Sequence, residues 1–410
     1  MPTTRPLALC ALLLLGCMVL GPIPLAHAKT FTVNVIDKDA DDVNAGDGLC
    51  DSDGTTAGPQ CTLRAAISEA NARAGADRIA LPAGTISLTL EGTYEDENAT
   101  GDLDITDDLI IDGAPPSESG VPRTIVQFAT SPPSAADRVF QIHGETSAVV
   151  FNGLTIQFGK APDAQFAGNG ARGGGIRNGG MLMLNDCIII GNEAGDGAFG
   201  AGSAGRGGDG GGIYSWGTLI LNRCTLLSNS AGDGAYGGGA VRGGGGGSGG
   251  GIASAHGTVT INDSVLTLNA AGRGGGSGAA RGGAGGHGGG IYVHGGSVLT
   301  ASNSTLGNNN AGKGGQGSVD TLDGLNGDGG GVYYDGTATL RGSTISRNTA
   351  RMGGGLYGAG VTSCELTMEN STVSGNKAIG SGGGIKSSGV LRLHNCTVAS
   401  NEAGLAADTL

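Results

Sequence analysis

Residues 210–231 read GGGIYSWGTLILNRCTLLSNSA, and this pattern recurs along the chain. Each copy has a glycine run that ends at an aliphatic residue, then alternating apolar and polar residues, then an asparagine about sixteen residues after the aliphatic one. The aliphatic residues are Ile176, Ile213, Ile252, Ile291, Val332, Leu356 and Ile385. The asparagines are Asn192, Asn229, Asn269, Asn309, Asn348, Asn376 and Asn401. Repetition of this kind predicts a stacked, coiled architecture.

The alternation within each copy predicts a β-strand. One such strand cannot bury its apolar face alone, but stacking successive copies pairs their backbones in parallel and builds a continuous core. The asparagines are separated by 37, 40, 40, 39, 28 and 25 residues, and the shortest values approach one bare coil. We therefore expect an all-β, right-handed parallel β-helix of about ten coils.

Two columns of polar residues keep one register through the repeats. The asparagines are expected to form a structural ladder, because an asparagine side chain tolerates left-handed backbone and bonds nearby backbone groups. Five positions before each asparagine lies a small residue suited to a crowded interior: Cys187, Cys224, Ser264, Ser304, Ser343, Ser371 and Cys396.

Four longer copies carry glycine-rich inserts between the asparagine and the next glycine run. The inserts are 196–207, 233–248, 273–287 and 313–327, and they should protrude from one edge of the helix. Two interpretations stay open. In the interpretation that we favour, the inserts only form turns, because glycine adopts positive φ without penalty. Alternatively, inserts on one face form a binding surface, in which Arg206, Arg242, Arg273 and Lys313 would contact a ligand.

The first 28 residues resemble a secretory signal. Arg5 supplies the positive charge, residues 7–20 form an apolar core, and Ala26-His27-Ala28 is a cleavage site. A competing lipoprotein site would place a lipid on Cys17. We divide the chain into a signal peptide (1–28), an amino-terminal cap with the first coils (29–110) and a repeat region (111–410).

Export permits disulfide bonds. Cys50 and Cys61 bracket a turn-rich segment and are expected to pair, whereas the pairing of the remaining cysteines stays open: Cys187, Cys224, Cys364 and Cys396. After Cys61 the period changes to that of a helix, with Thr62 as N-cap and Gly75 as its end. This short helix would cover the open end of the β-helix.

The stretch around this helix resembles the CSLREA domain of exported bacterial repeat proteins. The motif here is Cys61-Thr62-Leu63-Arg64-Ala65-Ala66, and the resemblance covers about residues 30–110. Residues 150–403 resemble the repeats of polymorphic outer-membrane proteins and of pectin-lyase-like β-helices. The second resemblance implies a fold more than an activity.

Acidic residues cluster in two places. Glu95, Asp96, Asp102 and Asp104 would supply oxygen ligands for calcium, which takes six to eight oxygens. A second cluster is Asp37, Asp39, Asp41, Asp42 and Asp47. The alternative for both clusters is a set of solvated loop carboxylates. The solvated carboxylates are the favoured interpretation, so the sequence requires no cofactor, and calcium stays open as the one candidate.

The sequence names no activity. Motifs of polysaccharide lyases, glycoside hydrolases and phosphate-binding loops do not appear, although several polar residues near the glycine runs could converge on the insert face: His256, His287, His294, Asp209, Asp328 and Asp335. The net charge of −13 argues against nucleic acid as a partner, and no segment after the signal is apolar enough to span a membrane.

We therefore expect a secreted or surface protein that binds extracellular polysaccharide or a cell surface without catalysis, as an adhesin or envelope component. The alternative is a polysaccharide lyase or glycoside hydrolase acting on the insert face.

Overall fold

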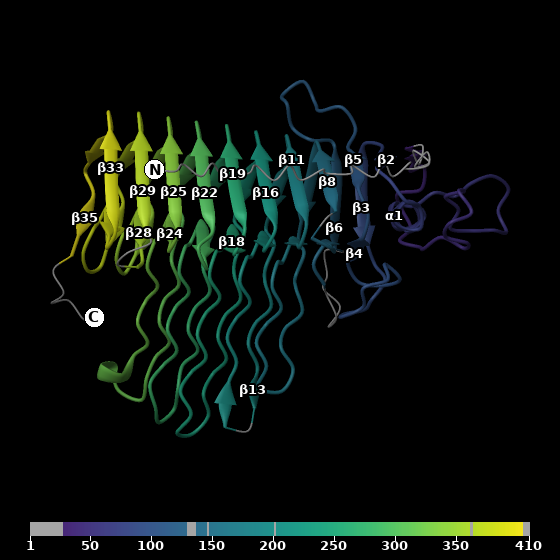
Figure 1. Cartoon of the computed structure of the whole chain (residues 1–410). Helices are drawn as coiled ribbons and strands as arrows, with labels where there is room; N and C mark the ends of the chain where they lie inside the picture. The colour runs from purple at the N-terminus through teal and green to yellow at the C-terminus, as the bar shows by residue number, and fades with distance from the viewer. Residues whose placement is uncertain (1–27, 129–136, 146, 201, 361–363, 405–410) are drawn as a thin grey trace, which may run out of the picture.

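Each complete coil contributes one strand to each of three parallel sheets, which wrap around a common core. The computed structural model describes residues 28–128, 137–145, 147–200, 202–360 and 364–404. The expected signal peptide and Cys17 therefore fall outside the described residues, apart from Ala28. Figure 1 shows the coils stacked side by side along a rod, with helix α1 near the amino-terminal end and long loops projecting from one edge.

Sheet 1 has eleven strands in the described part of the chain. In spatial order they are β1 (Thr30–Thr32), β2 (Asp77–Ala80), β5 (Leu109–Asp112), β8 (Ala148–Asn152), β11 (Met181–Asn185), β16 (Thr218–Asn222), β19 (Thr258–Asn262), β22 (Val298–Ser302), β25 (Thr337–Arg341), β29 (Glu365–Glu369) and β33 (Val390–His394).

Sheet 2 has nine strands, likewise counted over the described residues. They are β4 (Leu103–Ile105), β7 (Phe140–Ile142), β10 (Ile176–Asn178), β15 (Ile213–Ser215), β18 (Ile252–Ala255), β21 (Ile291–His294), β24 (Val332–Tyr334), β28 (Leu356–Gly358) and β32 (Ile385–Ser387).

Sheet 3 has ten strands within the same described ranges. They are β3 (Gly84–Leu88), β6 (Thr124–Phe128), β9 (Leu154–Gln157), β12 (Ile188–Ile190), β17 (Thr225–Leu227), β20 (Val265–Thr267), β23 (Thr305–Gly307), β26 (Thr344–Ser346), β30 (Thr372–Ser374) and β34 (Thr397–Ala399). The strand counts confirm the parallel β-helix of about ten coils.

Short elements complete the inventory. A small parallel sheet comprises β27 (Thr349–Ala350), β31 (Lys377–Ala378) and β35 (Glu402–Ala403). An antiparallel pair, β13 (Phe199–Gly200) and β14 (Ser203–Ala204), lies at the tip of the first insert, and the fourth insert contains a 3₁₀ turn, η1 (Asp320–Leu322).

The aliphatic residue after each glycine run packs inside the rod. Ile176, Ile213, Ile252 and Ile291 pair residue for residue on neighbouring strands of sheet 2 and are fully buried. Apolar residues on alternate positions of sheets 1 and 3 complete the core, so the coil repeat buries one continuous hydrophobic column.

The asparagine ladder is present and buried. The Nδ2 of Asn229 donates to the Oδ1 of Asn269 at 3.0 Å and to the carbonyl oxygen of Ile189 at 2.9 Å, and the neighbouring rungs repeat this arrangement. Since each side chain is bonded to the asparagine of the following rung and to a backbone carbonyl of the preceding coil, the ladder satisfies polar groups that would otherwise be buried unpaired.

The capping helix α1 spans Leu63–Asn71, close to the expected range. The Thr62 hydroxyl oxygen accepts the amide N–H of Ala65 at 3.1 Å, which confirms Thr62 as N-cap. The helix ends with Ala72 as C-cap, before Gly75. The amide N–H of Arg73 donates to the carbonyl oxygen of Ala70 at 3.1 Å, three residues back, so the last turn is tighter than an α-helical one. Cys50 and Cys61 form the expected disulfide, whereas Cys187, Cys224, Cys364 and Cys396 are free thiols.

The glycine-rich inserts correct the interpretation of these segments as simple turns. Each insert runs outward and returns, and outgoing and returning legs alternate along the rod. The amide N–H of Gly232 donates to Gly208, that of Gly247 to Gly232, and that of Gly272 to Gly247. The same alternation repeats three residues away along each leg, at Gly205, Ala235, Gly244 and Gly275.

Backbone hydrogen bonds that recur every third residue between neighbouring legs are typical of packed polyproline-II-like segments, in which glycine is needed at crowded positions. A Cβ built on Gly247 would lie 1.9 Å from the carbonyl oxygen of Gly208, and one on Gly232 would lie 1.8 Å from that of Gly195. The glycines therefore permit main chains to touch, and the four inserts form a wall of packed backbone beside sheet 2, which we call the glycine wall (Figure 1).

Candidate functional site

A groove of about 990 Å³ lies between the glycine wall and the outer face of sheet 2. The wall contributes backbone of 202–204, 240–246 and 284–285, together with Arg206 and Arg242. Sheet 2 and its adjoining turns contribute the polar and aromatic side chains His287, Tyr292, His294, Tyr333 and Asp335. Part of the groove is therefore lined by main-chain amide and carbonyl groups.

Aromatic side chains form a column along the floor of the groove. The strand register places one outward residue of each rung above the next, in the order Gln141, Arg177, Tyr214, Ala253, Tyr292, Tyr333, Tyr357 and Lys386. Ring centroids are 5.1 Å apart for Tyr292 and Tyr333, and 5.4 Å for Tyr333 and Tyr357. We call these residues the floor column.

The rings of Tyr292, Tyr333 and Tyr357 partly cover one another's faces, so their edges and hydroxyl groups remain for a ligand. Burial raises the pKa of Tyr333 to about 12 and raises the pKa of Tyr292 as well. Both phenols consequently stay protonated near neutral pH and act as hydrogen-bond donors.

His287 stands beside the floor column as a neutral imidazole. Its Nδ1 accepts the amide N–H of Asp328 at 3.0 Å, and its ring centroid lies 4.8 Å from that of Tyr333. Burial lowers the pKa of His287. Because Nδ1 is an acceptor, the proton of the neutral ring sits on Nε2, and His287 offers a donor to the groove.

His294 has the opposite arrangement. Its Nδ1 lies 2.5 Å from Oδ2 of Asp335, which also accepts the amide N–H of Gly295 at 3.2 Å. A carboxylate only accepts, so Nδ1 of His294 carries a proton, and in the neutral ring the lone pair is on Nε2. This pair has the orientation of a general base held by a carboxylate, and His294 lies 5.7 Å from Tyr292 between ring centroids.

Arginines gather around the groove in a protein whose net charge is −13. Arg206 and Arg242 line it. Farther along the floor column, the guanidinium of Arg172 lies 4.8 Å from the ring centre of Tyr214, and that of Arg177 lies 4.9 Å from the ring centre of Trp216. Arg172 and Arg206 share one carboxylate, that of Asp209, at 3.5 and 3.7 Å, so these four arginines still outnumber the acid that they contact.

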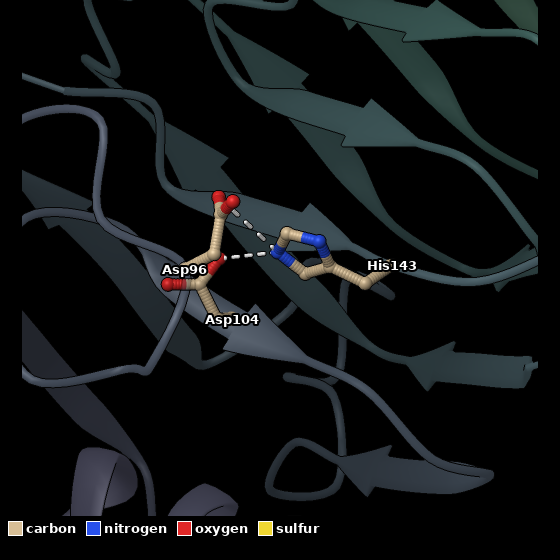
Figure 2. Close-up of side chains that lie close together, drawn as sticks. All are labelled: Asp96, Asp104 and His143. Atoms are coloured by element: carbon tan, nitrogen blue, oxygen red, sulfur yellow. Dashed lines mark hydrogen bonds and ion pairs between the residues drawn. The ribbon is translucent and has the colours of Figure 1, made fainter.

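A second polar cluster occupies the amino-terminal end of the floor column, where Asp104 on β4 pairs in register with Gln141 on β7. Nε2 of His143 lies 2.7 Å from Oδ1 of Asp104 and 3.8 Å from Oδ1 of Asp96 (Figure 2). Asp104 is fully buried, whereas Asp96 comes from the loop before β4 and is exposed.

The four acids expected to bind calcium take different positions. Asp96 and Asp104 come together as described. Oδ2 of Asp102 is bound by Arg138 at 3.0 Å, and burial raises the pKa of Asp102 well above its usual value. Glu95 accepts the amide N–H groups of its own loop, including that of Thr100 at 2.8 Å.

Of the second acidic cluster, Asp39 binds the buried guanidinium of Arg64. Asp41 and Asp42 accept hydrogen bonds from Ser68 and from the backbone amide of Asp51, respectively.

Sequence analysis missed two parts of these sites. It overlooked the floor column, although a tyrosine directly follows the repeat aliphatic residue at Tyr214, Tyr292, Tyr333 and Tyr357. It also missed His143, whose partners lie on another coil and in a loop. The expected convergence on the insert face holds for His287, His294 and Asp335, whereas Asp328 is bound by Arg351.

Within the described part of the chain, no helix is both long and apolar enough to cross a bilayer.

No protein-family model matches the chain, and no curated protein matches it significantly in sequence. Two solved structures match in fold. Pectate lyase Pel9A is 12% identical with a TM-score of 0.33, over 93% of this chain and 79% of the lyase. The A-module of the Azotobacter vinelandii mannuronan C-5 epimerase AlgE4 is 14% identical with a TM-score of 0.33, over 88% of this chain and 94% of the module. These overlaps are too loose to carry over a residue or an activity.

Proposed function

We propose that the protein binds an extended anionic polysaccharide lengthwise in the groove and acts on it as a lyase. The observation that carries the proposal is the floor column beside the glycine wall. Successive rungs are about 4.8 Å apart, which is close to the length of one hexose unit in an extended chain. A polysaccharide parallel to the rod would thus meet one outward side chain for each sugar.

Hydrogen-bonding groups suited to sugars line this path. The phenols of Tyr292 and Tyr333 and the Nε2–H of His287 are donors, and the glycine wall adds backbone groups of both kinds. Arg206 and Arg242 favour a ligand that carries carboxylates, because guanidinium groups bind carboxylates with matched geometry. An anionic glycan therefore fits better than a neutral one.

The His294–Asp335 pair supports an elimination reaction. Nε2 of His294 would remove the proton next to a uronate carboxyl group, and the released electron pair would form a carbon–carbon double bond. The glycosidic carbon–oxygen bond would break, and the leaving oxygen would take a proton from a donor such as the Tyr292 phenol. An arginine beside the uronate carboxylate would stabilise the charge that develops.

Hydrolysis has less support in this groove. A glycoside hydrolase uses two carboxyl groups flanking the bond. Among the described residues that line the groove, Asp335 is the carboxylate, and it is bonded to His294.

Binding without turnover, as in an adhesin, is the second candidate. The repetition of tyrosine over several rungs favours it, since a binding surface benefits from many similar contacts. Both candidates place the protein outside the cell or at its surface. Export is part of the proposal and agrees with the disulfide between Cys50 and Cys61.

The test incubates the purified protein with polygalacturonate, alginate and a neutral glucan, and measures both retention and new unsaturated ends. We expect retention and unsaturated ends with an anionic polymer. His294→Ala should lower the rate about 100-fold or more while retention persists, whereas His256→Ala, on the neighbouring rung, should leave it unchanged. Retention without new ends would favour adhesion, and failure of Tyr333→Ala to weaken retention would contradict the proposed groove.

A further inference from the structure

The cluster at the amino-terminal end of the floor column brings three metal-ligating atoms together from three parts of the chain. Asp96 comes from the loop before β4, Asp104 from β4 itself, and His143 from the residue after β7. Nε2 of His143 is 2.7 Å from Asp104 and 3.8 Å from Asp96. Tetrahedral bonds of about 2.0 Å imply about 3.3 Å between ligand atoms, and the two measured separations lie on either side of this value.

Asp104 is held so that one oxygen faces the imidazole. The amide N–H of Asn98 donates to Oδ2 of Asp104 at 3.3 Å, which leaves Oδ1 directed at His143. Asn98 is itself fully buried, and its side chain donates to the carbonyl oxygen of Arg64 and the hydroxyl of Ser68 on α1. The loop that carries Asp96 is thereby fastened to the capping helix through the side chain of Asn98.

Two neighbours, a carboxylate and an amide N–H, make opposite demands on the Nε2 atom of His143. Besides Asp104, the amide nitrogen of Gln141 lies 2.8 Å from it. The oxygen and nitrogen of the Gln141 side-chain amide cannot be exchanged, because Oε1 accepts N–H groups from Arg138 at 2.9 Å and Arg177 at 2.8 Å.

If Nε2 carries a proton for Asp104, that proton opposes the N–H of Gln141. If Nε2 is bare, its lone pair faces the Asp104 carboxylate. No protonation state of the imidazole alone satisfies both neighbours. A cation bound to the Nε2 lone pair and to both carboxylates removes the repulsion between that lone pair and Asp104, and the Gln141 amide group then turns its N–H away from Nε2. Gln141 then keeps its 2.7 Å bond to Asp96 and orients that ligand.

We propose that Asp96, Asp104 and His143 bind one divalent transition-metal ion, with Zn²⁺ the best fit. An imidazole nitrogen and only three protein ligands suit zinc, whereas calcium prefers six to eight oxygens. The exposed side chain of Asp96, 69% accessible, leaves the outer side open for a fourth ligand such as water. The site does not depend on the proposed polysaccharide function.

The proposed site differs from the calcium site considered from the sequence in both its ligands and its ion. Asp96 and Asp104 are retained, His143 is added, and Asp102 and Glu95 are bound by other groups.

The test titrates the purified, chelator-treated protein with Zn²⁺, Mn²⁺, Mg²⁺ and Ca²⁺ and measures binding of each ion by calorimetry. Binding of Co²⁺ is followed by its visible absorption. We expect one equivalent of Zn²⁺ and a tetrahedral or five-coordinate Co²⁺ spectrum.

Asp96→Asn changes an exposed side chain and should fold normally while weakening Zn²⁺ binding tenfold or more. His143→Ala should abolish the Co²⁺ bands. His256→Ala, which removes an exposed imidazole elsewhere, is the matched control and should bind as the unaltered protein does.

Absence of stoichiometric Zn²⁺ binding would overturn the inference. So would Zn²⁺ binding that is unchanged in both Asp96→Asn and His143→Ala, or a preference for Ca²⁺ over Zn²⁺.

Discussion

At the scale of the residue, glycine and histidine carry most of what is unusual in this protein. Glycine matters in the wall through the space a Cβ would occupy rather than through positive φ. Histidine matters because His143, His287 and His294 each have a different hydrogen-bond environment, and the environment sets whether each ring donates, accepts or binds a cation.

Gly247→Ala tests the packing of the glycine wall. The new Cβ would lie 1.9 Å from the carbonyl oxygen of Gly208, so two main chains must move apart. We expect a loss of about 1–3 kcal/mol in the free energy of unfolding, measured by denaturant titration. Gly245→Ala is the matched control two residues away, where the nearest atom to a Cβ is Nε of Arg206 at 3.4 Å. Equal effects of the two substitutions would contradict the packing argument.

The pH dependence of stability should reveal His287. Burial lowers its pKa in the folded protein, with Arg351 and Arg206 acting in the same direction and Asp328 opposing. The unfolded chain therefore binds the proton more readily, and acidification below about pH 6.5 favours unfolding.

The contribution of His287 is fully present above that pH and is lost as pH falls through the folded pKa. His287→Gln keeps an acceptor for the Asp328 amide and should flatten the fall in melting temperature between pH 8 and pH 5. An unchanged pH profile in this variant would show that His287 does not titrate as described.

Residues whose roles repeat along the chain were predictable, and residues that contact other coils at a single place were not. The asparagine ladder could be predicted because one position recurs in seven copies. His143 occurs once, and its contact with Asp104 spans 39 residues. The inserts were interpreted as simple turns because the three-residue spacing belongs to hydrogen bonds between outgoing and returning legs. The sequence of a single insert does not show this spacing.

At the scale of the element, α1 does more than cover the end of the rod. The Arg64 side chain is fully buried and donates to both oxygens of Asp39 and to the carbonyl oxygens of Asn98, Gly101 and Asp102. One side chain thus joins the cap, the following loop and the start of β4. The helix and its N-cap were predictable from local sequence, whereas these long-range bonds were not.

Arg64→Lys should destabilise the cap strongly. Lysine cannot reproduce the planar set of donors, so buried carbonyls and the Asp39 carboxylate lose partners. We expect a loss of about 3 kcal/mol, the lower end for breaking a buried pair, measured by thermal and denaturant unfolding. Arg78→Lys, at an exposed pair with Asp112, is the control and should cost less than about 1 kcal/mol. A small effect of Arg64→Lys would mean that the cap is held chiefly by its apolar face.

At the scale of the whole molecule, the rod turns a short repeat into a long surface. The fold could be predicted from the sequence because each coil repeats the same apolar pattern. The groove could not, since it forms only where the inserts of three coils, 196–207, 233–248 and 273–287, lie beside sheet 2.

The length of the floor column sets an expectation for oligosaccharides. From Tyr214 to Tyr357 it spans four rung steps, or about 19 Å. Affinity for an anionic oligosaccharide should rise with each added sugar until the chain covers this span and then level off, as measured by calorimetry with a size series. Tyr333→Ala should lower the affinity of the longer members more than that of a disaccharide. An affinity independent of length would contradict lengthwise binding.

The glycine wall also bears on the entropy of recognition. A surface of long side chains must give up rotamer freedom when a ligand arrives, at about 0.5–1.5 kcal/mol for each side chain immobilised. The wall has few rotamers to lose, because its glycines gave up their backbone freedom when the chain folded. A glycan that lies against it would meet amide and carbonyl groups already fixed in place, so the protein's own conformational entropy would change little on binding.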